Sequence, residues 1–170
     1  AMQKALVAGK VRAIGLSNFV DARFVDLVEN MEVKPAVLQL ETHVFSQQKR
    51  MRELMAPYGT RLMAWAPLAE GRNGIFTHPT LTAIGAKYGK TAAQTALRFL
   101  MAEDVIAIPK SVHRERLVEN FSIVDFDISA EDLDAIRALD GGKPMFADFN
   151  DPALAKFLLE YDAKFNPERQ

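Results

Sequence analysis

Short apolar stretches alternate with longer amphipathic stretches along most of the chain. The short stretches are rich in Val, Ile, Leu and Ala and are bounded by turn signals, which predicts buried β-strands. The longer stretches place apolar residues at helical spacing. The first three strands begin about 25 residues apart, which suits a repeated strand–loop–helix unit. The predicted strands are Val11–Leu16, Ala36–Leu40, Arg61–Ala66 and Asp104–Ile108.

Helix start and stop signals divide the amphipathic stretches into separate helices. Thr91 and Gln94 have the spacing of a capping box, which predicts a helix that runs to Met101. Ser129 precedes another helix, which the glycines at 141 and 142 are expected to close. The other predicted helices follow Asp21, run from Ser46 to Gly59, cover Pro79–Tyr88 and His113–Phe121, and begin at Asp151-Pro152.

Strands that alternate with helices predict a parallel sheet with right-handed crossovers and with both faces of the sheet buried. The fold class is therefore α/β, and both a doubly wound sheet and a (β/α) barrel satisfy the pattern. No G-x-G-x-x-G fingerprint follows any predicted strand, which argues against the Rossmann version of the doubly wound sheet.

Composition excludes several classes of protein. The 170 residues are 49% hydrophobic, which is ample for one core, and the net charge of -1 provides no basic field for nucleic acid or an anionic membrane. No apolar run approaches the ~18 residues of a membrane span. The absence of cysteine excludes disulfides and thiolate metal sites, and fits a cytoplasmic protein.

Polar side chains follow the predicted strands at their carboxyl ends, where either architecture would bind a ligand. Singly, each has an ordinary explanation: Ser17 or Asn18 could cap the next helix, and Trp65 could belong to the core. Together, a hydroxyl, two amides and an indole suit a planar ligand that carries a carboxamide. These residues are Ser17, Asn18, Gln39 and Trp65.

A second polar group follows the fourth strand. Lys110 and Ser111, with Arg116 on the next helix, suit a phosphate ester, although exposed cations are usually only solvated. A nicotinamide dinucleotide phosphate carries both a carboxamide and a phosphate ester, and cations favour its 2′-phosphate over a free 2′-hydroxyl. The remaining candidates, His43, His78 and His113, lack metal-ligand spacing, and Glu41 shows no partner, so all four are interpreted as structural or surface residues.

Four segments, in the order GKVRAIGLSNF, LQLETH, LMAWAPLAEG and IAIPKSVHRERLVENF, resemble the second half of an aldo-keto reductase. The resemblance covers about Ala1 to Asn150, and IGLSNF and IPKSV…R…EN are its most specific motifs. It implies the parallel (β/α) units of a TIM-type (β/α)₈ barrel, of which about half is present here. Residues 1–140 would then form the C-terminal half of the barrel with the cofactor site, and residues 141–170 a C-terminal loop and helix next to the substrate.

The resemblance further implies an oxidoreductase that uses NADPH to reduce small aldehydes or ketones to alcohols, with this chain supplying the cofactor-binding half. Ser17, Asn18 and Gln39 would hold the nicotinamide carboxamide, and Trp65 would stack on its ring. Pro67, Leu68 and Gly71 would lie along the pyrophosphate. Lys110, Ser111, Val112 and Arg116 would hold the 2′-phosphate, and Glu119 and Asn120 would reach the adenine.

Reductases of this family draw a catalytic Asp, Tyr, Lys and His from the first half of the barrel. No catalytic residue is therefore predicted in this chain, which we expect to be inactive by itself. The alternative hypothesis is a half-length, non-catalytic protein that binds a dinucleotide or self-associates, because a half barrel leaves sheet edges open for pairing.

Overall fold

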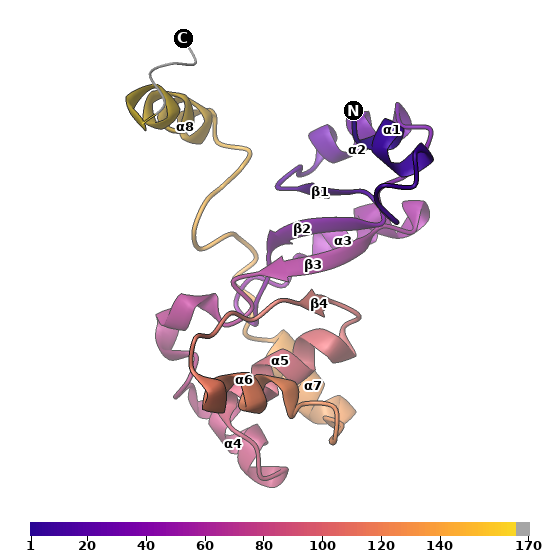
Figure 1. Cartoon of the computed structure of the whole chain (residues 1–170). Helices are drawn as coiled ribbons and strands as arrows, with labels where there is room; N and C mark the ends of the chain where they lie inside the picture. The colour runs from indigo at the N-terminus through magenta and orange to yellow at the C-terminus, as the bar shows by residue number, and fades with distance from the viewer. Residues whose placement is uncertain (166–170) are drawn as a thin grey trace.

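Four parallel strands form a single sheet in the order β1-β2-β3-β4 (Figure 1). The computed structural model describes residues 1–165, and the side chains of residues 1–161. Strand order follows chain order without reversal, which is the arrangement of consecutive (β/α) units; a doubly wound sheet would reverse at a switch point. The strands are Gly15–Ser17 (β1), Val37–Glu41 (β2), Arg61–Trp65 (β3) and Ile106–Ala107 (β4).

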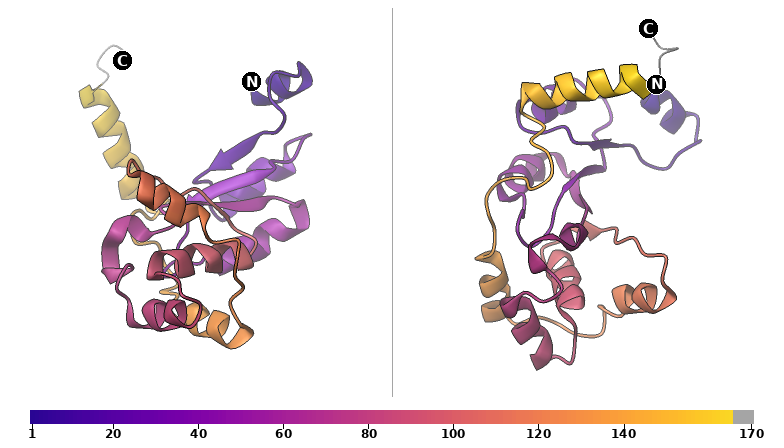
Figure 2. Two further views of the ribbon diagram at one scale, coloured as in Figure 1. Left: turned by 60° about the horizontal axis from the view of Figure 1, so that its bottom comes forward. Right: turned by 90° about the vertical axis from the view of Figure 1, so that its left-hand side faces the viewer.

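Helices connect the strands and continue beyond the last one. The long α8 stands apart from the rest of the molecule, at the end of an extended loop (Figures 1 and 2). No helix within residues 1–165 is long and apolar enough to cross a membrane. The helices are α1 (Met2–Val7), α2 (Ala22–Glu29), α3 (Lys49–Met55), η1 (Ala56–Tyr58), η2 (Ala69–Gly74), α4 (Pro79–Lys87), α5 (Ala92–Ala102), α6 (Arg114–Phe121), α7 (Ala130–Arg137) and α8 (Pro152–Phe165).

One face of the sheet is buried beneath the helices, and the other face is not. Leu38, Leu40, Leu62 and Ala64 occupy alternate strand positions and are fully covered. On the opposite face only Glu41 is buried; Arg61 is exposed, and Val37, Gln39, Met63 and Trp65 are half-buried. The prediction that both faces are buried is therefore wrong for this chain, because four strands do not close a barrel and leave its inner face uncovered. The core combines these four residues with Phe24, Val28, Met51, Met55, Phe99, Leu100 and Ile136.

Several predicted boundaries are wrong by a few residues. The first strand pairs with β2 only from Gly15, so residues 11–14 precede it. The helix expected after Ser46 begins at Lys49, because Ser46 forms a backbone bridge with His43 instead. The helix after Ser129 already ends at Arg137, ahead of the glycines.

Local capping signals, in contrast, are confirmed. The Thr91 hydroxyl accepts from the Gln94 N–H at 3.2 Å, and the Gln94 side chain accepts from the Thr91 N–H at 3.1 Å. Ser129 accepts from the Asp132 N–H at 3.2 Å. These bonds satisfy N–H groups that the first turn of a helix leaves unpaired. Asp21 is the exception, since it makes no such bond to α2.

Candidate functional site

The polar residues that end the first three strands lie next to one another. Ser17 on β1 is in register with Gln39 on β2, which is in turn in register with Met63 on β3. The indole N–H of Trp65 donates to the Asn18 side-chain oxygen at 2.9 Å. The residues predicted to hold a planar carboxamide ligand are therefore gathered at the carboxyl edge of one sheet. Trp65 is half-buried and lies on the uncovered face of the sheet.

Asn18 also turns the chain at the end of β1. Its φ of +60° is in the left-handed region, which asparagine tolerates better than most residues. Its N–H donates to the Gln39 carbonyl at 3.0 Å and extends the ladder by one bond. Asn18 therefore makes the turn at the end of β1, and its amide oxygen accepts from Trp65.

The residues predicted to bind a phosphate ester line a cavity of about 570 Å³. The cavity lies between the loop after β4, α6 and the start of α5, and Leu68 and Phe76, which follow β3, line another side. Sequence reasoning missed four of its members, Phe76, Thr91, Ala93 and His113, which come from other segments of the chain or carry no phosphate-specific signal. The predicted members are Leu68, Lys110, Ser111, Val112, Arg116, Glu119 and Asn120.

The charged side chains around this cavity differ in whether they have a partner in the protein. Within the described part of the chain, Lys110 and Arg116 form no ion pair, and both are exposed. Glu119 instead accepts from the Thr91 hydroxyl at 2.6 Å, which turns this carboxylate toward α5. Two unpaired cations and a hydroxyl beside a cavity are a suitable set of donors for a phosphate group.

The loop after β3 connects the two groups of residues. Pro67 is buried and Gly71 is exposed, and neither lines the cavity. Non-glycine residues in this loop repeatedly adopt left-handed φ angles, a strained conformation that is concentrated at functional sites in proteins. They are Ala66, Ala69, Glu70 and Asn73, with φ of 49°, 48°, 49° and 52°.

Glu41, the last residue of β2, has hydrogen-bond partners that no sequence pattern indicated. Its carboxylate is 3% exposed and accepts from the backbone N–H groups of Met145 at 2.5 Å and Phe146 at 3.1 Å. The Nε2 atom of His43 lies 3.2 Å from the same carboxylate. Burial by itself would raise the pKa of Glu41, but these three hydrogen bonds outweigh burial and lower that pKa below its ordinary value.

Among residues 1–161, no group of three or more histidine or carboxylate side chains is placed to hold a metal ion. His43 is fully buried and lies beside Glu41, whereas His113 is exposed and lines the cavity.

Comparison with known proteins agrees with this geometry. Residues 1–141 match the aldo/keto reductase family. The glyoxal reductase of Bacillus subtilis (strain 168) is 40% identical over 139 residues, which are 82% of this chain and 50% of that protein. The NAD(P)H-dependent D-xylose reductase I,II of Candida tropicalis is 37% identical over 164 residues, covering 89% of this chain and 49% of that protein.

Solved structures give the same result. MGS-M4, an aldo-keto reductase from a Medee basin deep-sea metagenome library, superposes with a TM-score of 0.85 at 36% identity, over 89% of this chain and 56% of its own. A Gox0644 mutant in complex with NADPH superposes with a TM-score of 0.83 at 33% identity, over 88% of this chain and 55% of its own.

The chain therefore belongs to the aldo/keto reductase family. It spans about half the length of the curated relatives that it matches. The fold prediction of (β/α) units from such a barrel, with about half of the barrel present, is confirmed.

Proposed function

We propose that this chain is the C-terminal, cofactor-binding half of an NADPH-dependent aldo-keto reductase that converts aldehydes or ketones to alcohols. The observation that carries the proposal is the cavity beside α6, where Lys110 and Arg116 lack carboxylate partners among the described residues. A 2′-phosphate supplies the negative charge that these cations lack, whereas a free 2′-hydroxyl does not.

Each predicted contact keeps the role that the resemblance implies. Ser111 and the exposed Val112 flank the phosphate, and Glu119 and Asn120 lie toward the adenine. Leu68 contributes an apolar wall, and the strained loop that contains Pro67 and Gly71 follows the pyrophosphate.

At the other end of the cofactor, the strand-end residues hold the nicotinamide. Ser17, Asn18 and Gln39 provide a hydroxyl and two amides for its carboxamide. Trp65, which donates to Asn18, provides a flat apolar surface for its ring. When bound, NADPH supplies the hydride. The residues of this chain bind the cofactor, orient its ring and cover one side of it.

Proton donation to the carbonyl substrate is assigned to residues outside this half, in agreement with the family's use of Asp, Tyr, Lys and His. Residues 1–140 then form the barrel portion, and residues 141–170 form a loop and helix beside the substrate; residues 166–170 of that range lie outside the described residues. We expect the chain by itself to bind cofactor without reducing a carbonyl.

A cofactor titration of the purified chain tests the proposal. Trp65 is the only tryptophan, so its fluorescence reports on the nicotinamide end. We expect saturable quenching by NADPH that weakens as salt is added, because salt screens exposed charges, and much weaker binding of NADH. An absence of saturable quenching, together with no NADPH binding by calorimetry, would contradict the proposal.

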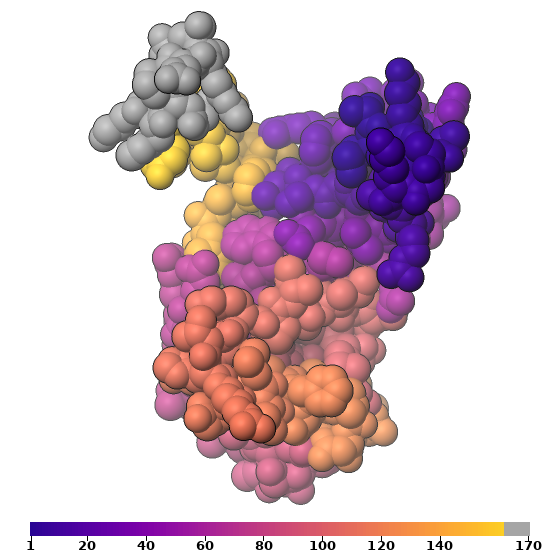
Figure 3. Space-filling view, in the orientation of Figure 1, coloured from indigo at the N-terminus to yellow at the C-terminus, as the bar shows by residue number. Residues whose placement is uncertain are grey.

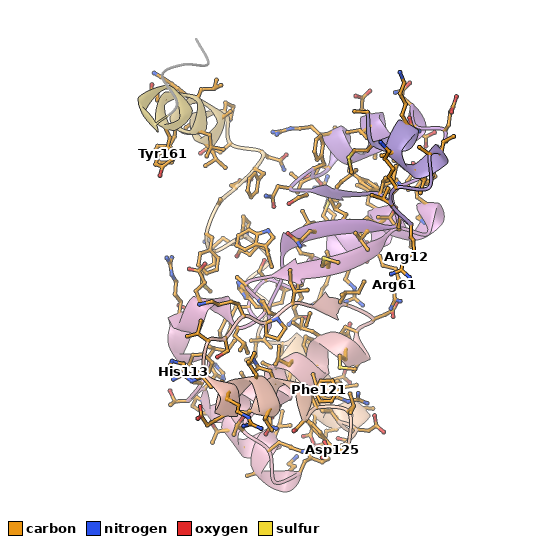
Figure 4. All side chains as sticks on the ribbon, in the orientation of Figure 1. Arg12, Arg61, His113, Phe121, Asp125 and Tyr161 are labelled. Atoms are coloured by element: carbon orange, nitrogen blue, oxygen red, sulfur yellow. The ribbon has the colours of Figure 1, made fainter. Side chains whose placement is uncertain are left out.

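A second candidate, self-association, is favoured by the open side of the molecule. An apolar groove of about 660 Å³ runs beside the edge strand β4, and Phe121 at its border is 79% exposed. In Figure 4, His113 and Phe121 mark the two ends of α6, and the cavity and the groove adjoin at this helix, since Asn120 lines both. The space-filling view shows the α6 region at the front of the molecule (Figure 3). Sedimentation equilibrium at several concentrations tests this candidate.

A further inference from the structure

The segment 140–150, which we name the C-terminal strap, leaves α7 and crosses the end of β2 before α8 begins. Both of its ends are fastened to the body. The N–H of Gly141 donates to the Phe45 carbonyl at 2.9 Å. The side chain of Asn150 donates to the Asp21 carboxylate at 2.6 Å. These bonds fix the path of the strap but do not fix the side chains at its centre.

At the centre of the strap, the N–H groups of Met145 and Phe146 both bond to a single side chain. Glu41 accepts from two successive N–H groups, those of Met145 and Phe146, with one carboxylate oxygen on each. Charge-assisted bonds of this kind are about twice as strong as neutral ones. Glu41 therefore orients the peptide from which the Phe146 side chain extends.

His43 completes this anchor. The N–H of Phe45 donates to the Nδ1 atom of His43 at 3.2 Å, so Nδ1 is the unprotonated nitrogen. Nε2 then carries the proton and donates to Glu41 at 3.2 Å. The carboxylate thus has three donors and stays ionised in a site that is almost closed to water.

The Phe146 ring lies between two parts of the proposed cofactor site. Its centroid is 5.7 Å from that of Trp65, which is expected to carry the nicotinamide. The Arg72 guanidinium, in the loop expected to follow the pyrophosphate, lies 4.5 Å from the same ring, within the range of a cation–π contact. Phe146 therefore links the nicotinamide platform to the pyrophosphate loop.

We propose that Glu41 is a positioning residue of the cofactor site, which acts by holding Phe146 against Trp65 and Arg72. The proposal rests on the proposed function, since Trp65 and Arg72 matter to binding only if they contact the cofactor. Without the carboxylate, the centre of the strap loses both of these hydrogen bonds, and Phe146 is held less firmly between the platform and the loop. The cofactor must then order both parts when it binds, which lowers its affinity.

The first test requires no cofactor. In Glu41→Gln we expect faster hydrogen exchange at the amides of Met145 and Phe146, and a shift in the emission of Trp65. Phe146→Ala should reproduce the emission shift. Glu103→Gln is the matched control, because Glu103 is also a largely buried carboxylate but is bonded to Arg52 and Arg137 rather than to the strap. It should leave the emission unchanged and speed the exchange of these two amides no more than its loss of global stability requires.

The second test measures the affinity for NADPH through the fluorescence of the cofactor itself. We expect Glu41→Gln to bind about tenfold more weakly, which corresponds to about 1.4 kcal/mol. The charge change works in the opposite direction, because the loss of a negative charge by itself favours an anionic ligand. In the Phe146→Ala background, Glu41→Gln should add little further loss, since both changes remove the same contact.

Unchanged exchange at the two amides with unchanged emission in Glu41→Gln would overturn the positioning role. A full tenfold loss in the Phe146→Ala background would also overturn it, because Glu41 would then act by another route. If Glu41→Gln does not fold, Phe146→Ala decides alone: wild-type emission and affinity would contradict the proposal. Failure of the wild-type chain to bind NADPH defeats the proposed function, whereas the exchange and emission data still decide the role of Glu41.

Discussion

Replacement of Arg116 by alanine should selectively weaken the binding of NADPH. Arg116 lines the cavity, is exposed, and has no ion-pair partner within the described residues. Its replacement therefore breaks no ion pair or side-chain hydrogen bond within the described residues, and the fold should be unaffected. The effect of the substitution is then confined to the ligand.

The solvent exposure of Arg116 sets the expected loss of NADPH affinity. A charge-assisted bond to a phosphate contributes about 1.5–3 kcal/mol when it is well shielded, and solvent screening reduces this for an exposed arginine. We expect a loss of about 1–2 kcal/mol, which is a factor of about 5–30 in the dissociation constant of NADPH. The dissociation constant of NADH, which lacks the 2′-phosphate, should hardly change.

Equilibrium titrations that follow the fluorescence of the reduced cofactor measure both constants. Arg114→Ala is the matched control, because Arg114 has the same charge and lies on the same helix, but does not line the cavity. Arg116→Lys keeps the charge but loses the bidentate hydrogen bonding of the guanidinium. It should therefore bind NADPH more tightly than Arg116→Ala and more weakly than the wild type. The dependence of NADPH affinity on salt should be shallower for Arg116→Ala than for the wild type.

Two outcomes would refute the reasoning. Equal losses for Arg116→Ala and Arg114→Ala would mean that only the overall charge of α6 matters. Equal losses for NADPH and NADH would mean that Arg116 does not meet the 2′-phosphate.

Three further predictions concern stability and assembly. Burial raises the pKa of Glu103, but Arg52 and Arg137 outweigh it and lower that pKa below its ordinary value, so its stabilisation is present at neutral pH and is lost as the pH falls below about 4.5. Glu103→Gln should lower the free energy of unfolding in urea by about 2–3 kcal/mol at pH 7 and flatten this acid dependence. Gly85→Ala should lower it by about 1–3 kcal/mol, because the new Cβ would lie 2.5 Å from a backbone oxygen between α4 and α5; an unchanged unfolding curve would contradict that packing. If the chain self-associates through the groove beside β4, Phe121→Ser should shift it toward monomer in sedimentation equilibrium, and an unchanged association constant would exclude this face.

The elements that the sequence predicted well depend on neighbours a few positions away. The second and third strands are within one residue of their predicted limits. The capping box at Thr91 and the cap at Ser129 are as predicted. Much of the proposed phosphate site was also recognisable, because six of the predicted residues lie in one continuous stretch between Lys110 and Asn120 and line one cavity. Such signals are local, since hydrophobic period, caps and loop motifs act over one or two turns.

The strap shows what local signals do not contain. Glu41 and Met145 are 104 positions apart and meet only because the sheet brings the end of β2 beneath the loop after α7. The uncovered inner face of the sheet is likewise a property of the number of strands that come together, not of any one strand. The sequence by itself determined the (β/α) units and most of the candidate ligand-binding residues. The tertiary structure alone decided which of them share a cavity and which buried carboxylate supports them, because those contacts depend on how distant segments pack.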